Sequence, residues 1–129
     1  MYPERKLKQK AGPVLDQMVH EHVMGYEPLE EGGWRAPNGD LCPVCWPYST
    51  SPAWSHVVAE TMLANHTTRP WDGFALRSTR HPDRGLLWHA SFRRDLMYAW
   101  AEGVTPEEAI CLAALLAIEA DRRSAAERK

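Results

Sequence analysis

The stretch Pro47-Tyr48-Ser49-Thr50-Ser51-Pro52-Ala53-Trp54 decides how this chain of 129 residues is interpreted. It begins as a proline-bounded loop rich in hydroxyl groups and continues into an apolar segment. Ser51 is a natural N-cap and Pro52 suits the first helical position, so the stretch predicts a helix over residues 52–65. Because the first-turn N–H groups of a helix have no intrahelical partners, the same loop is also a physical anion site.

Two further helices are predicted, one near each end of the chain. Pro13 opens the first, over residues 13–24, in which apolar side chains recur at helical spacing along one stripe. The segment Thr105-Pro106-Glu107-Glu108 opens the last, since it forms a capping box with proline at the first helical position. The residues that follow are apolar nearly all round, so we expect this helix to be buried on more than one side.

Between these helices, alternating apolar side chains predict three strands, over Trp71–Ser78, Leu86–Phe92 and Leu96–Ala101. The last segment also has a helical composition, but three strands make a more stable sheet than two. Short turns join the strands, so the sheet should be antiparallel. We therefore expect an α+β fold of order α-loop-α-β-β-β-α, with a three-stranded antiparallel sheet sandwiched between helices.

The length of the chain predicts a single domain. We expect it to occupy residues 13–124, with a flexible charged tail over 1–12 and a second tail over 125–129. Residues 25–47 are rich in glycine and proline and should form an irregular excursion over the core. A loop of this length is unusual in a compact domain unless it has a function.

The charge, the apolar runs and the number of cysteines limit the partners and the cellular compartment that we expect for this protein. Fifteen Lys and Arg stand against seventeen Asp and Glu, a net charge of −2, so charge gives no reason to expect a nucleic acid or a membrane surface. No apolar run approaches the roughly 18 residues of a transmembrane helix, and no signal peptide opens the chain. Three cysteines are an odd number, which argues against a disulfide framework. We expect a cytoplasmic protein.

Arginine is concentrated in one part of the chain. Between residues 69 and 94 the local charge is +4, from six Arg and two Asp, namely Arg69, Arg77, Arg80, Arg84, Arg93, Arg94, Asp72 and Asp83. Arg77 lies in the middle of a predicted strand and shares a strand face with Trp71. Arg80, Arg84, Arg93 and Arg94 fall where turns are expected, and such side chains are ordinarily solvated.

The candidate ligand site combines phosphate-binding and base-stacking groups, namely Tyr48, Ser49, Thr50, Arg77, Trp46 and Trp71. Hydroxyls and helix-start N–H groups bind phosphate, and Arg–phosphate pairs are bidentate. A tryptophan ring stacks on a base with about 1–3 kcal/mol. Together these groups predict a small anionic ligand such as a nucleotide. The alternative is structural, because Ser51 alone can cap the helix while Tyr48 packs on the sheet.

The pair Cys42-x-x-Cys45 has the spacing of half a zinc site, and a complete site needs two more ligands. No second pair of this kind is present, and Cys111 suits a small buried hydrophobe in the apolar last helix. Histidines such as His56 or His66 would have to complete the site, and they are ten residues apart. We therefore expect no cofactor, with zinc as the alternative.

No catalytic motif stands out in the chain. Among its six histidines, His20 and His22 are two residues apart and diverge on a helix, so the zinc-protease motif is absent. Nucleophile-elbow and phosphate-loop sequences are absent as well. The chain is expected to bind rather than to catalyse, with a small hydrolase as the alternative.

Three segments resemble the phage ABA-sandwich domain family. They are Leu15-Asp16-x-Met18-Val19-x-x-x-Val23-Met24-Gly25, Pro47-Tyr48-Ser49-Thr50 followed by Ala53-Trp54, and Thr105-Pro106-Glu107-x-Ala109-Ile110-Cys111-x-Ala113-Ala114-Leu115-Leu116-Ala117. They occur in the family's order. The chain departs from the family after Thr50, where an Asp is usual, and in carrying Cys42-Pro43-Val44-Cys45.

The resemblance implies a small phage or prophage protein of the host cytoplasm, with an antiparallel sheet between helix layers and no settled enzymatic activity. Phage proteins of similar size include sponges that sequester nucleotide-type immune signals, so we expect a non-enzymatic, anti-defence binding protein. One alternative is a protein-interaction module that blocks a host protein through a patch of Trp34, Trp46 and Trp100. Another is a hydrolase of a nucleotide signal. Exposed sheet edges favour a homo-oligomer.

Overall fold

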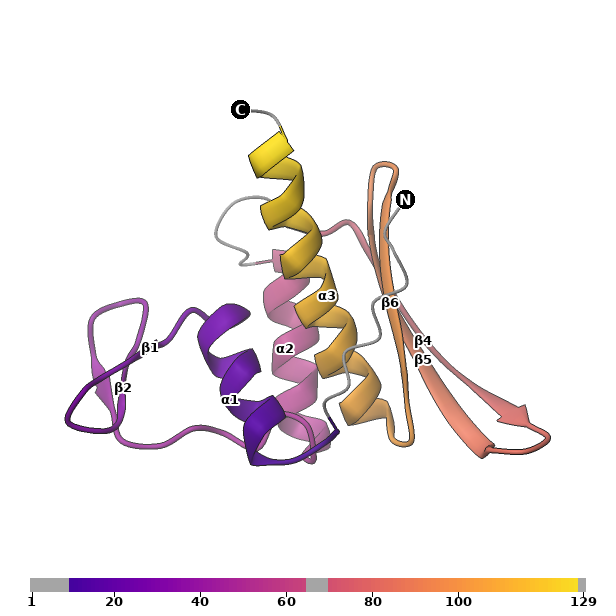
Figure 1. Ribbon diagram of the computed structural model, residues 1–129, viewed down its shortest axis with the longest axis horizontal. Coiled ribbons are helices and arrows are strands. Elements are labelled where there is room, and N and C mark those ends of the chain that lie inside the picture. The colour runs from indigo at the N-terminus through magenta and orange to yellow at the C-terminus, as the bar shows by residue number, and fades with distance from the viewer. Residues whose placement is uncertain (1–9, 65–69, 128–129) are drawn as a thin grey trace.

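The computed structural model describes residues 10–64 and 70–127, which form three helices and two antiparallel three-stranded sheets (Figure 1). The helices are α1 (Pro13–His22), α2 (Pro52–Ala64) and α3 (Pro106–Glu127). The smaller sheet contains β1 (Glu27–Pro28), β2 (Trp34–Arg35) and β3 (Leu41–Cys42), and the larger contains β4 (Gly73–His81), β5 (Gly85–Arg94) and β6 (Met97–Gly103). The predicted α+β class with a three-stranded antiparallel sheet is confirmed. Residues 1–9 of the predicted tail, His66 and Arg69 lie outside the described residues.

Helix α3 is the central layer of the fold. It packs against β5 and β6 on one side and against α1 and α2 on the other. Residues 109–115 are all buried, in keeping with an apolar sequence that continues nearly all round the helix. All three helices lie on one side of the larger sheet rather than on both, and the smaller sheet lies beyond α1 (Figure 1).

Successive side chains of the strands point to opposite faces of the larger sheet, so one face is buried against α3 and the other is exposed. Phe92 pairs with Phe74 in β4 and Ala99 in β6, and Phe92 and Ala99 are buried on the side of α3. Tyr98 and Trp100 point to the opposite face and are 46% and 38% exposed. This alternation of small buried and large exposed side chains explains why residues 97–103 form a strand although their composition also suits a helix.

The predicted capping box at the start of α3 forms with one change of partner. Thr105 Oγ1 accepts the Glu108 N–H at 3.2 Å, as predicted. Glu108 Oε1 accepts the N–H of Val104 at 3.0 Å, one residue before the expected partner. Glu108 Oε2 accepts the Ala11 N–H at 2.7 Å, so this single carboxylate joins the start of α1 to the start of α3.

The segment over residues 25–47 is more regular than predicted, because its turns connect paired strands. Strand β2 pairs with both β1 and β3. Gly33 and Gly39 adopt φ of 80° and 95°, a left-handed conformation that glycine reaches without strain. Tyr26 stacks on the His20 ring with centroids 3.8 Å apart, and Trp34 packs edge-on against it at 4.7 Å. These contacts hold the smaller sheet on α1.

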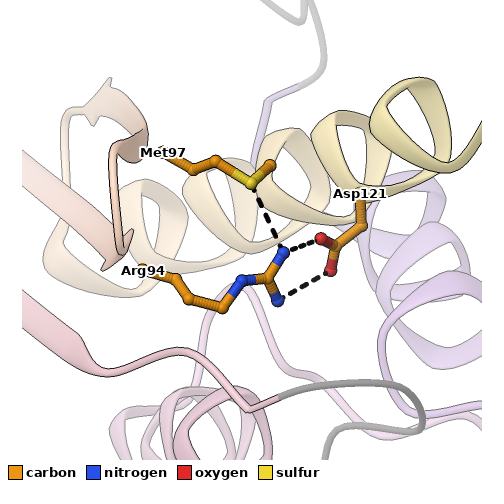
Figure 2. A network of polar contacts seen from close by, with 3 residues as sticks. All are labelled: Arg94, Met97 and Asp121. Atoms are coloured by element: carbon orange, nitrogen blue, oxygen red, sulfur yellow. Dashed lines mark hydrogen bonds and ion pairs between the residues drawn. The ribbon is translucent and has the colours of Figure 1, made fainter. Parts of the chain in front are cut away.

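Arg94 is buried, and its prediction as a solvated turn residue is wrong. Strand β5 extends two residues further than predicted, so Arg94 pairs with Met97 and its side chain points to the helices. The guanidinium forms a bidentate pair with Asp121 of α3 and contacts the Met97 sulfur at 3.5 Å (Figure 2). It also lies over the Trp71 ring, 4.4 Å from the centroid.

Candidate ligand-binding site

The hydroxyl-rich loop before α2 is joined to α1 by its own side chains. Ser49 donates both its N–H and its hydroxyl to Asp16 Oδ1, each at 2.7 Å. Ser49 Oγ in turn accepts the Gly12 N–H at 2.9 Å. Ser49 and Asp16 are buried, whereas Thr50 is exposed. Ser51 caps α2 as predicted, since it accepts the Trp54 N–H at 3.4 Å. The buried Ser49 hydroxyl therefore already has hydrogen-bond partners within the fold and is not directed at a ligand.

Tyr48 is fully buried, and its hydroxyl lies 2.7 Å from Nδ1 of the equally buried His20. Burial is the largest cause that raises the pKa of the Tyr48 hydroxyl, and burial lowers the pKa of His20 to about 4. Tyr48 therefore keeps its proton and donates it to a neutral imidazole. Two of the three segments that resemble the phage family, those around Asp16 and around Tyr48, thus contact each other through buried polar groups.

The tryptophans predicted to stack on a base have partners inside the fold. Trp46 stacks on Trp54 of α2 at 4.7 Å with an interplanar angle of 3°. Trp71 is 1% exposed and lies beneath the Arg94 guanidinium. Strand β4 begins only at Gly73, and the backbone N–H of Trp71 donates to the Met62 carbonyl in the last turn of α2. Trp71 therefore turns to the helix side and does not share a face with Arg77.

The predicted Trp34, Trp46 and Trp100 patch is not formed as a single surface. Trp34 and Trp46 belong to a chain of aromatic contacts that runs through His20, Tyr48 and Trp54. Trp100 lies on the larger sheet, on the face that points away from the helices.

Cys42 and Cys45 are free thiols, and each lies near a carbonyl oxygen of its own segment. Burial and the nearby Asp16 carboxylate raise the pKa of Cys45 to about 11, so the thiol is protonated at neutral pH. Within residues 10–64 and 70–127, no three His, Cys, Asp or Glu side chains are grouped so as to hold a metal ion. Cys111 is a buried core residue, as predicted.

The face of the larger sheet that points away from the helices gathers polar and aromatic side chains. Arg77, His89 and Glu102 form one row across the three strands. The His89 ring stacks on Trp100, with centroids 5.1 Å apart and an interplanar angle of 19°. Arg93 and Tyr98 face each other one row beyond Trp100. We call this set, Arg77, His89, Arg93, Tyr98 and Trp100, the open sheet face.

Two arginine side chains on the open sheet face have no carboxylate partner among the described residues and can bind an anion. Glu102 lies 3.6 Å from the Arg84 guanidinium, so this carboxylate is balanced by its own partner. Arg77 and Arg93 are exposed, and neither guanidinium forms a hydrogen bond or an ion pair within the described part of the chain. Burial and the Arg77 guanidinium lower the pKa of His89, while Glu102 opposes them. Burial and the Arg77 cation beside it thus both favour the neutral form of the His89 ring.

The sequence predicted one member of the open sheet face, Arg77, as a ligand residue. It did not single out Tyr98, because residues 96–101 fitted a helix as well as a strand. The alternation of Tyr98, Trp100 and Glu102 with small residues was the signal that could have assigned the face. Tyr48 and Ser49 lie on the far side of α3, and no hydrogen bond, ion pair or ring contact links them to Arg77 among the described residues.

Comparison with known proteins places the fold. No family model matches the chain, and no curated protein matches it. Among solved structures, the chain is similar to a phage protein from Bacillus cereus ATCC 14579, with a TM-score of 0.59 and 14% identity, over 90% of this chain and 98% of that one. At this identity the likeness shows a shared fold. None of the described helices is both long and apolar enough to cross a membrane.

Proposed function

We propose that this chain is a small non-enzymatic protein that binds a nucleotide-type ligand on the open sheet face. The observation that supports this most is the position of the exposed Arg77 beside the stacked His89 and Trp100 rings. Antiparallel sheets with helices on one side and aromatic rings on the other stack bases in RNA-binding domains. The open sheet face has the same elements, although the analogy is one of surface chemistry.

Each part of a nucleotide has a partner of suitable chemistry on this face. A base stacks on the exposed Trp100 ring, a contact that contributes about 1–3 kcal/mol. The Arg77 and Arg93 guanidiniums offer bidentate hydrogen bonds to phosphate. We propose a mononucleotide or dinucleotide rather than a long strand, because the whole chain has a net charge of −2 and long strands require many phosphate contacts.

We further propose that the protein is of phage origin and sequesters its ligand in the bacterial cytoplasm. Two observations support the origin: the similar Bacillus cereus structure is that of a phage protein, and three segments resemble the phage ABA-sandwich family. A protein that binds a nucleotide-derived immune signal without consuming it lowers the free concentration of that signal. This activity would counteract a host defence that depends on it.

A thermal-shift screen against cyclic and linear nucleotides and ADP-ribose derivatives tests the proposal. A ligand at 100 times its dissociation constant stabilises a protein by about 2.7 kcal/mol, which raises the melting temperature by several degrees. We expect a hit that is recovered intact after the protein is denatured. A hit recovered as fragments would replace sequestration with hydrolysis, and a panel without any shift would contradict nucleotide binding.

A further inference from the structure

Residues of α1 and of the smaller sheet line an open groove. These elements lie at the end of the molecule opposite the β4–β5 hairpin (Figure 1). The volume of the groove is about 380 Å³, and Val14, Met18, Glu21, Pro28 and Trp34 are among the residues that line it. Val14 is 58% exposed, so an apolar wall faces solvent. The Glu21 carboxylate, 44% exposed, lies at the same groove. An apolar stem with a cationic head fits such a lining.

The surroundings of the groove are acidic. Residues 21–41 carry five carboxylates and a single Arg, a net charge of −4. Glu21, Glu27, Glu30, Glu31 and Asp40 are all exposed. This end of the molecule therefore attracts a basic surface, and the attraction is screened by salt.

The opposite end of the same chain has the complementary chemistry. The outer part of the β4–β5 hairpin, residues 77–89, carries three Arg against one Asp, a net charge of +2. It projects away from the helices in Figure 1. Arg80 and Leu86 pair across its tip. On the face that elsewhere packs on α3, Leu76 and Leu86 remain 37% and 48% exposed. The tip thus presents exposed leucines beside a cation that has no hydrogen bond or ion pair in the described residues.

We propose that the groove binds the β4–β5 hairpin of a second copy of this chain. Leu86 packs against Val14 and Met18, and the Arg80 guanidinium lies between the Trp34 ring and the Glu21 carboxylate. The opposite charges of the two ends and the exposed apolar groups on both surfaces specify this occupant. The interface uses the helix-facing side of the hairpin, so it leaves the open sheet face accessible and is independent of the proposed nucleotide site.

A charge-swap experiment tests this interface. Glu21→Arg and Arg80→Glu each place like charges together, so each should weaken self-association by about tenfold or more in sedimentation velocity. An equimolar mixture of the two variants should restore association, because each variant then meets an opposite charge. Glu60→Arg, at an exposed position on α2, is the matched control and should associate like the unmodified chain.

The outcomes are decisive in either direction. Loss of association in both single variants, with rescue in the mixture and an unaffected control, supports the proposed pairing. A chain that remains monomeric at every concentration overturns it. Association that both variants retain, or that the mixture does not rescue, also overturns it, since the contact then uses other surfaces. Circular dichroism of each variant confirms that the fold is intact, and nucleotide binding is measured separately.

Discussion

The Arg94 guanidinium forms a bidentate pair with the Asp121 carboxylate between the larger sheet and α3, against the Trp71 ring (Figure 2). Only 5% of the Arg94 side chain and 16% of the Asp121 side chain are exposed. A complete buried ion pair adds little net stability, but the loss of one partner leaves a desolvated charge. The pair therefore fixes the C-terminal half of α3 on the end of β5.

Replacing Asp121 with alanine should lower the free energy of unfolding by about 3–5 kcal/mol, because Arg94 would stay buried without its carboxylate. Glu60→Ala removes an exposed carboxylate that lies 3.6 Å from His56, and it should cost less than about 1 kcal/mol. Urea titration of both variants measures the difference. Equal effects of the two substitutions would show that Arg94 does not depend on Asp121.

Replacing Ser49 with alanine should cost about 1–3 kcal/mol, since the part-buried Gly12 N–H and the buried Asp16 carboxylate each lose a partner. Thr50→Ala, at the exposed neighbour, should change stability by less than about 0.5 kcal/mol. Neither substitution should alter ligand affinity, because both lie outside the open sheet face. If the Ser49→Ala variant kept full stability but no longer bound the ligand, the ligand site would lie in the hydroxyl-rich loop before α2 instead of on the open sheet face.

Stability should fall in acid because His20 is buried as a neutral ring. Burial lowers its pKa from 6.5 to about 4, so the unfolded chain binds the proton more readily than the folded one. The contribution is fully present above pH 6.5 and is lost as the pH falls toward about 4, with a total of about 3 kcal/mol. Unfolding measured from pH 7.5 to pH 4 should show a smaller decline in His20→Gln. Identical slopes in the two proteins would contradict this assignment.

Trp71 and Trp100 should respond in opposite ways to substitution. Trp71→Ala removes a fully buried ring and should cost about 3–5 kcal/mol of stability. Trp100→Ala removes a partly exposed ring and should cost about 1 kcal/mol, while it weakens nucleotide binding by about 1–3 kcal/mol. Melting temperatures and calorimetric titrations separate the two effects. If Trp100→Ala bound the ligand as tightly as the unmodified chain, stacking on this ring would be ruled out.

Local sequence signals predicted the helices and the antiparallel sheet, because proline, capping residues and apolar periodicity act within a few residues. Ser51 and Thr105 cap their helices as expected. Tertiary contacts could not be predicted in this way. Ser49 fits an anion site until Asp16, which lies 33 residues away in the chain, occupies its hydroxyl. The same holds for Arg94, whose burial depends on where β5 ends and on Asp121 in α3.

The most direct test of the open sheet face compares two arginines of one strand. Arg77 lies on that face, and Arg80, three residues further along β4, points to the opposite side. With the nucleotide found in the thermal-shift screen, calorimetric titration should show that Arg77→Ala weakens binding by about tenfold, or about 1.4 kcal/mol, with little change in melting temperature. Arg80→Ala should bind as the unmodified chain does. Equal affinity of all three proteins would contradict a nucleotide site on this face.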